Sequence, residues 1–230
     1  MPDNVANPAP ASRAERKERT RQALLTGTLD AIADRSFSSV SLREVTRAAG
    51  IVPTAFYRHF ASMEDLGVAV VEDSMRVLRK ILKDVRRHPS ADNARESLEL
   101  LVGEIRDHDV QFRFLIRERT GGVGEVRRAI QTELRMVVHE LTHDLSRIPA
   151  LQIWPRDDLA MVADLIVSTM LATVVDLVEV EPESAAERDI VERALSQLRV
   201  VMLGMAQWQP RSVVGSRRAD SELRVQAARG

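Results

Sequence analysis

Two short helical segments joined by a glycine constrain the fold of this chain more than any other feature. Ser41 begins the first segment and Glu44 follows three residues later, a pattern in which both side chains cap free backbone amides at a helix N-terminus. Gly50 ends this segment, as a residue that readily adopts the left-handed conformation does. Pro53 begins the next segment, where its missing amide hydrogen costs nothing. The sequence therefore predicts a helix-turn-helix.

Aromatic side chains are concentrated in the second of these helices. Aromatic residues make up 3% of the chain, yet the segment GIVPTAFYRHF at 50–60 contains Phe56, Tyr57 and Phe60. Phe56 and Phe60 lie four residues apart on one helix face, where Val45 of the first helix can pack with them. A helix this short is marginal in water on its own, so we expect the two phenylalanines to anchor it.

The opposite face of the same helix predicts DNA binding. It presents Thr54, Tyr57 and Arg58 at helical spacing, with Ala55 and His59 beside them. An arginine can bind guanine, threonine and alanine can contact a thymine methyl group, and tyrosine can bind a phosphate. The alternative is that these residues form the solvated face of an ordinary helical hairpin.

The rest of the chain also predicts helices. Sustained alternation of apolar and polar residues is absent, glycine and proline are sparse, and apolar residues make up 44% of the chain. We therefore expect an all-α protein with about nine helices. Beyond the two short helices, the expected positions are 14–35, 63–88, 91–108, 110–119, 123–147, 156–180 and 184–208.

Residue types along the chain also suggest its division into domains. Residues 1–12 and 211–230 are expected to be disordered ends, and the second of them is basic. Between them, residues 13–62 are expected to form the helix-turn-helix domain and residues 63–210 a second helical domain.

Charge and cysteine content limit the partners and the compartment. The net charge is −1, but residues 12–60 carry an excess of basic side chains, which suits a polyanion partner for that end of the chain. The alternative is an uneven solvated surface, and charge alone does not decide between the two. The absence of cysteine excludes disulfides and cysteine-ligated metals. The sequence begins without a signal-peptide pattern, and the most apolar run, Leu165–Val175, is shorter than the roughly 20 residues of a membrane span. We expect a cytoplasmic protein with no membrane-spanning segment.

The expected helix at 156–180 is apolar on almost every side. A helix of this kind must be buried on more than one face. We expect it to form a helix-bundle interface with a second copy of the chain, because symmetric dimers are the commonest assembly. The alternative is a central helix of a monomer.

Residues 15–70 resemble the DNA-binding domain of the TetR family of one-component bacterial regulators. The match runs in order through SLREVTRAAGIVPTAFYRHFASMEDL. The sequence of this segment, together with the later FRFLIRERTGG, is most similar to the FabR/DesT-type subgroup, which represses unsaturated fatty-acid synthesis and desaturase genes. One departure is Met63, which stands where the family usually has a lysine that contacts phosphate.

The resemblance implies how the chain binds DNA. It implies a homodimer in which each helix-turn-helix places its second helix in one major groove of a near-palindromic operator. Residues 63–210 then form a ligand-binding and dimerisation domain. The implied DNA contacts are Ser41, Arg43, Pro53, Thr54, Ala55, Tyr57, Arg58 and His59.

The resemblance also implies a long-chain acyl-CoA as effector. The sequence shows no glycine-rich phosphate loop and no Ser-His-Asp set in a suitable order, so we expect neither a cofactor nor a catalytic site. Aromatic and methionine side chains would line a tunnel for the acyl chain, and arginines would bind the phosphates. The candidates are Phe112, Arg113, Phe114, Arg117, Arg119, Trp154 and Met170. The alternatives are that these residues are core and ion-paired side chains, and that the effector is another hydrophobic molecule, such as a drug or a metabolite. The sequence leaves open whether the effector releases or strengthens DNA binding.

A short motif suggests one rival function. Residues 139–143 read HELTH, the H-E-x-x-H spacing that zinc hydrolases use for two metal ligands and a general base. Asp144 places a charge where such enzymes have an uncharged residue, and no His or Glu follows before Glu179 to serve as the usual third ligand. Asp157 and Asp164 are the remaining candidates. We therefore expect a DNA-binding regulator and not a zinc hydrolase.

Overall fold

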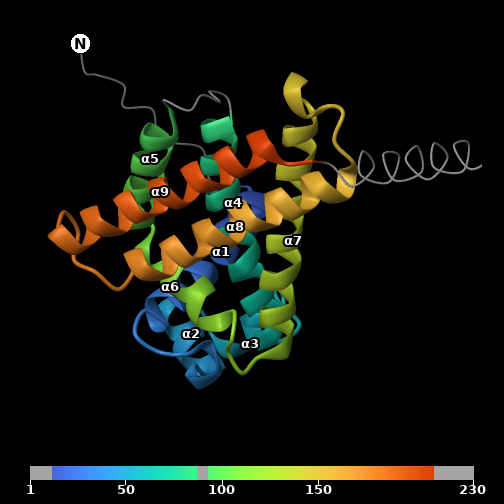
Figure 1. Cartoon of the computed structure of the whole chain (residues 1–230). Helices are drawn as coiled ribbons and strands as arrows, with labels where there is room; N and C mark the ends of the chain where they lie inside the picture. Colours follow the sequence, from blue (N-terminus) through green and yellow to red (C-terminus); the bar gives the residue numbers. More distant parts are fainter. Residues whose placement is uncertain (1–11, 87–92, 210–230) are drawn as a thin grey trace, which may run out of the picture. The chain divides into compact units, whose positions relative to one another are not determined.

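The computed structural model describes residues 12–86 and 93–209. In this part of the chain all regular structure is helical, which confirms the all-α prediction (Figure 1). The α-helices are α1 (Arg13–Ala31), α2 (Leu42–Ala48), α3 (Pro53–Phe56), α4 (Met63–Arg86), α5 (Asn93–Asp107), α6 (Asp109–Glu118), α7 (Gly124–Ser146), α8 (Arg156–Leu177) and α9 (Ala185–Gln207). Two 3-10 helices, η1 (Phe37–Ser39) and η2 (Pro149–Leu151), complete the set. The expected disordered ends, apart from Ser12, lie outside the described residues.

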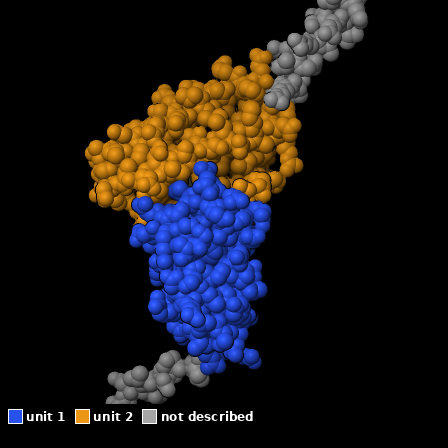
Figure 2. Space-filling view, turned by 90° about the horizontal axis from the view of Figure 1, so that it is seen from below, with its two compact units in different colours: residues 1–74, 113–130 blue, residues 75–112, 131–230 orange. Residues whose placement is uncertain are grey.

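The chain folds into two compact units (Figure 2). Unit 1 consists of Met1–Ser74 and Arg113–Ile130, and unit 2 of Met75–Phe112 and Gln131–Gly230. The helix-turn-helix therefore shares its unit with the end of α6 and the start of α7, which the expected domain boundaries assigned to the second domain.

The helix caps follow the sequence closely. Ser41 and Glu44 form the reciprocal capping box at the start of α2, and Gly50 has a φ of 67°. Pro53 is the first residue of α3, and the Ser62 hydroxyl accepts a hydrogen bond from the amide of Asp65 in α4. These caps set where the helices begin and end, because each side chain satisfies a backbone group that the helix leaves free.

Three helix ends differ from the prediction by three residues or more, and one of them is the end of α8, which lies at Leu177 and not at residue 180. α1 ends at Ala31 and not at Arg35, with Ile32 as its C-cap, and the carbonyls of Ile32 and Ala33 accept hydrogen bonds from Arg117 of α6. α3 is α-helical only over Pro53–Phe56, whereas the sequence predicted a helix up to Phe60. The following residues form tighter turns, in which the amide of His59 donates to the carbonyl of Phe56 at 2.8 Å.

The core of unit 1 joins the helix-turn-helix to the end of α6. Val45 and Phe56 are fully buried, and the Phe37 ring packs edge-on against Phe114 with 6.4 Å between the ring centroids. Gly67 of α4 lies so close to Val126 that a Cβ atom on Gly67 would stand 2.6 Å from a Val126 methyl carbon. Contacts this close require the loop after α1, the start of α4 and the start of α7 to be packed together.

In unit 2, α8 and α9 pack side by side and α5 contacts both helices (Figure 1). Arg106 of α5 forms an ion pair with Glu187 of α9, and the Trp208 indole donates to the buried carboxylate of Asp158 at 3.1 Å. α8 is long and apolar enough to cross a membrane by length and composition alone, but 33% of its most apolar window is buried in the fold. The core helix of a soluble protein passes the same test.

Gly121 and Gly122 offer a matched test of the packing in unit 1. A Cβ atom on Gly121 would stand 2.2 Å from the Glu118 carboxylate, whereas one on Gly122 would meet nothing within 4 Å. We expect Gly121→Ala to lower the free energy of unfolding by about 1–3 kcal/mol and Gly122→Ala to change it by less than about 0.5 kcal/mol. Thermal and urea unfolding followed by circular dichroism measure both changes. Equal stability of the two variants would contradict the close packing of Glu118.

Candidate nucleic-acid interface

The interface begins with the two phenylalanines that hold α3 in place. Phe56 is 0% exposed and Phe60 is 7% exposed, and their ring centroids lie 5.8 Å apart. Tyr57 packs its ring edge-on against Phe56. This arrangement confirms that the aromatic residues of this segment anchor a helix too short to be stable alone.

The outer face of this segment brings six of the eight predicted DNA contacts together. Tyr57 is 62% exposed although it is aromatic. Exposed tyrosine and arginine side chains on a short, firmly packed helix suit binding to bases and phosphates. The six residues are Pro53, Thr54, Tyr57 and Arg58, which are exposed, and Ala55 and His59, which are half-buried.

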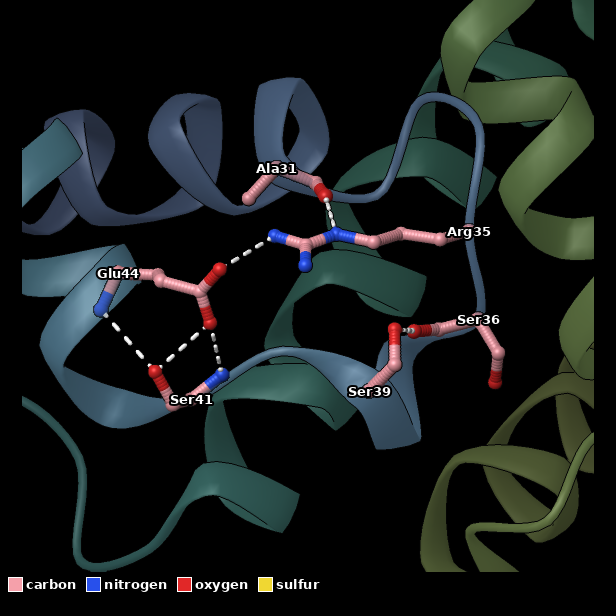
Figure 3. A network of polar contacts seen from close by, with 6 residues as sticks. All are labelled: Ala31, Arg35, Ser36, Ser39, Ser41 and Glu44. Atoms are coloured by element: carbon pink, nitrogen blue, oxygen red, sulfur yellow. Dashed lines mark hydrogen bonds and ion pairs between the residues drawn. The ribbon is translucent and has the colours of Figure 1, made fainter.

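The other two predicted contacts lie at the start of α2. Arg43 is exposed. The Ser41 hydroxyl lies in the capping box, where it donates to Glu44 Oε2 at 2.7 Å and accepts from the amide of Glu44 (Figure 3). Ser41 therefore orders α2 in this structure, and its contact with DNA stays a prediction.

Glu44 is a fully ionised acid within this interface. A hydrogen bond from Arg35, followed by hydrogen bonds from the amide and the hydroxyl of Ser41, lowers the pKa of Glu44 to about 2 (Figure 3). Arg35 reaches it through Nη2, which donates to Glu44 Oε1 at 2.8 Å. The carboxylate is thus held at the N-terminal end of α2, where a helix favours negative charge.

Val52 belongs to this surface, and the sequence analysis missed it. It is the N-cap of α3 and is 64% exposed, without making a side-chain capping bond. Its position directly before Pro53 could have identified it from the sequence, because the residue before a proline that begins a helix lies at the N-terminal tip of that helix. An exposed valine at the tip of a DNA-reading helix can contact a thymine methyl group.

The N-terminal half of α1 adds positive charge to the interface. The Arg21 guanidinium lies 5.0 Å from the centroid of the Phe60 ring. Burial, followed by the nearby charges of Lys17, Arg21 and Arg58, lowers the pKa of His59. His59 Nδ1 is buried and has no hydrogen-bond partner among the described residues. Lys17 and Arg21 of α1 thus lie near His59 and Phe60, which follow α3.

The HELTH segment does not assemble a metal site in the described residues. His139 and His143 are both exposed, and His139 Nε2 lies 3.0 Å from Arg156 Nη2. Over residues 12–86 and 93–209, no group of three or more His, Asp or Glu side chains is placed to hold a metal ion. The two histidines instead line an open cleft of ≈ 360 Å³ together with Trp154.

The seven predicted ligand-binding residues are divided between the two units. Arg113, Phe114, Arg117 and Arg119 lie in unit 1, whereas Phe112, Trp154 and Met170 lie in unit 2. Phe112 and Phe114 are buried, at 4% and 2% exposure. The Arg117 guanidinium donates to backbone carbonyls within unit 1. Ligand binding by these seven residues stays a prediction.

Two family profiles match the chain. The profile of bacterial regulatory proteins of the tetR family matches residues 24–70, which include the whole helix-turn-helix. The profile of the tetracyclin repressor-like C-terminal domain matches residues 91–202. The chain belongs to the TetR family. It is a TetR-family transcriptional regulator.

Solved structures of TetR-family regulators share this fold at low sequence identity. A regulator from Rhodococcus sp. is 19% identical with a TM-score of 0.62, and the match covers 80% of this chain and 99% of that chain. A regulator from Syntrophomonas wolfei is 15% identical with a TM-score of 0.65, covering 81% and 96%. FadR from Bacillus subtilis, solved in complex with stearoyl-CoA, is 18% identical with a TM-score of 0.60, covering 78% and 96%. These identities show a shared fold and leave the FabR/DesT-type subgroup a prediction.

Proposed function

We propose that this TetR-family regulator is a cytoplasmic repressor that binds a near-palindromic operator as a homodimer and responds to long-chain acyl-CoA. Its targets would be genes of fatty-acid synthesis or desaturation. The observation that carries the DNA-binding part is the α3 surface, where Tyr57 and Arg58 are exposed directly after α3 while Phe56 and Phe60 are buried. Two such helices on a dimer suit two successive major grooves on one side of the DNA.

Variants of the exposed face test operator binding. We expect Arg43→Ala and Tyr57→Phe each to weaken operator binding about tenfold, because each removes a hydrogen bond to a base or a charged phosphate. The probe is a fluorescent duplex selected by the wild-type protein from a random-sequence library, and fluorescence anisotropy measures the affinity. Arg188→Ala, a change at an exposed arginine of α9 in unit 2, is the control. Wild-type affinity in both test variants would remove the assignment of this surface to DNA.

A dimer is supported by the apolar side chains that α8 and α9 leave exposed. Met161 and Leu165 of α8 are 41% and 49% exposed, and Val200 and Leu203 of α9 are 68% and 60% exposed. Exposed apolar residues on two long, adjacent helices mark a surface that another protein covers. A second copy of the chain would join two helices of its own to these two and form a four-helix bundle.

The dimer proposal has a matched test at three exposed leucines. We expect Leu165→Glu and Leu203→Glu to weaken dimerisation by about a hundredfold or more, because a carboxylate would be buried against an apolar partner. Leu100→Glu is the control, since Leu100 lies on α5 and is 53% exposed. Light scattering coupled to size-exclusion chromatography reports the mass across a dilution series. Dimers of equal stability in all three variants would contradict the α8–α9 interface.

An acyl-CoA effector is supported by the sequence resemblance and by the shared fold of a regulator solved with stearoyl-CoA. The cleft beside Trp154 measures ≈ 360 Å³. Pockets for drug-sized ligands span about 300–1,000 Å³, so this cleft is at the lower end of that range, whereas a long-chain acyl-CoA is larger than a drug-sized ligand. We therefore propose that the acyl chain enters among the apolar residues of unit 2, with Phe112, Trp154 and Met170 as candidate walls.

The operator assay also distinguishes the effector classes. We expect palmitoyl-CoA or oleoyl-CoA to change operator affinity by about fivefold or more, because an effector must bind the two DNA-binding states differently. Free coenzyme A and free palmitate are the controls for the two halves of the ligand. No response to either acyl-CoA would leave operator binding intact and favour the second candidate, a regulator of another hydrophobic ligand such as a drug or metabolite.

A further inference from the structure

A hydrogen-bonded cluster joins α6 to the connection between α1 and α2. Arg117, next to the end of α6, donates from Nη1 to the carbonyl oxygens of Ile32 at 2.8 Å and Arg35 at 2.7 Å. Its Nη2 donates to the carbonyl oxygen of Ala33 at 3.3 Å. One guanidinium therefore binds three backbone carbonyls of the connection, a geometry that the planar arrangement of arginine donors allows and a lysine cannot reproduce.

Glu118 binds the next part of the same connection. Its Oε1 accepts hydrogen bonds from the amide of Phe37 at 2.8 Å and from the Ser36 hydroxyl at 3.1 Å. Glu118 is 1% exposed, and Phe114, one helical turn earlier, packs against the Phe37 ring. Two consecutive residues of α6 thus hold consecutive parts of the connection from the end of α1 to η1.

The side chain of Arg35 extends this cluster to α2. Its Nη2 donates to Glu44 Oε1, and Glu44 in turn forms the capping box with Ser41 (Figure 3). A continuous path of hydrogen bonds therefore runs from Arg117 through the backbone and side chain of Arg35 to the first turn of α2. That turn carries Arg43, which is exposed on the DNA-binding surface.

We propose that Arg117 and Glu118 are positioning residues for operator binding. They hold the connection between α1 and α2 so that Arg35 and Glu44 keep the first turn of α2, and with it Arg43, in the geometry that DNA requires. This inference rests on the proposed operator binding. It assigns a DNA-binding role to two residues far from the helix-turn-helix in sequence, one of which the sequence analysis assigned to ligand binding.

The hydrogen bonding of Glu118 indicates that this residue positions the connection between α1 and α2 and does not merely stabilise the fold. Its Oε2 is buried and has no hydrogen-bond partner among the described residues. A buried carboxylate with one unpaired oxygen does not maximise stability, because an apolar side chain of similar size avoids the cost of desolvation. What the carboxylate supplies is a fixed acceptor for the amide of Phe37 and the hydroxyl of Ser36.

A double-mutant cycle in operator affinity tests the inference. The variants are Arg117→Met, Arg35→Met and their combination, and the probe is the duplex selected by the wild-type protein. We expect each single variant to weaken binding about tenfold, as for loss of hydrogen bonds that order a contact residue. The double variant should bind only slightly more weakly than either single variant, since both changes interrupt one path. The slope of log affinity against log salt concentration should fall by about one, as for loss of one phosphate contact.

Conservative variants separate positioning from a loss of folding. Glu118→Gln keeps an acceptor for Phe37 and should retain near wild-type affinity, whereas Glu118→Leu should lose affinity as Arg117→Met does. Arg79→Met, which removes an ion pair between α4 and Glu133 of α7, is the control for loss of a partly buried arginine. All affinities are measured at a temperature where circular dichroism shows each variant to be folded.

The outcomes distinguish this inference from the proposed function. If Tyr57→Phe weakens binding but Arg117→Met binds as the wild type does, operator binding stands and the positioning role is wrong. Effects of Arg117→Met and Arg35→Met that multiply, with an unchanged salt slope, would also overturn it. If the wild-type protein selects no duplex at all, the proposed function itself fails.

Discussion

The candidate DNA-binding surface depends on the burial of Phe56. α3 has four residues, too few for its backbone hydrogen bonds to hold it as a helix in water. A fully buried phenylalanine ring, packed against Tyr57 and Phe60, fixes the segment instead. The direction in which Tyr57 and Arg58 point follows from that burial, because both residues succeed the anchored one along the same turn. The burial of an apolar side chain thus determines where the polar side chains that would contact DNA are placed.

A second support comes from residues distant in sequence. Arg113–Ile130 belong to the same compact unit as the helix-turn-helix, and Phe114 and Val126 pack against the loop after α1 and the start of α4. The helix-turn-helix is therefore not an autonomous segment at the N-terminal end of the chain. Its connection between α1 and α2 takes hydrogen bonds from α6 that no residue of the N-terminal segment supplies. Folding of the DNA-binding surface and the position of α6 are consequently linked.

The sequence predicted the features that local chemistry determines. The capping box at Ser41, the left-handed Gly50 and the start of α3 at Pro53 all depend on residues within a few positions of one another. The partners of Arg117 could not be predicted, because they are backbone carbonyls, which every residue type has. The end of α1 was also placed too late, and the residues beyond it form turns whose carbonyls bind a side chain from another helix. The candidate ligand residues were grouped by type and spacing, which does not determine in which compact unit a residue folds.

The candidate interface contains a negative charge as well as the excess of basic side chains in the N-terminal segment. Glu44, with its pKa lowered to about 2, carries a full negative charge at neutral pH, and it lies in the same helix turn as Arg43. Arg35 neutralises it, so Arg35 is not available to DNA phosphates. Were Arg35 lost, an unpaired carboxylate would face the polyanion, and repulsion would add to the loss of order at α2. The positive charges that can act on DNA are therefore those on this surface that no acid pairs. Arg35 is not one of them as long as the connection after α1 holds it on Glu44.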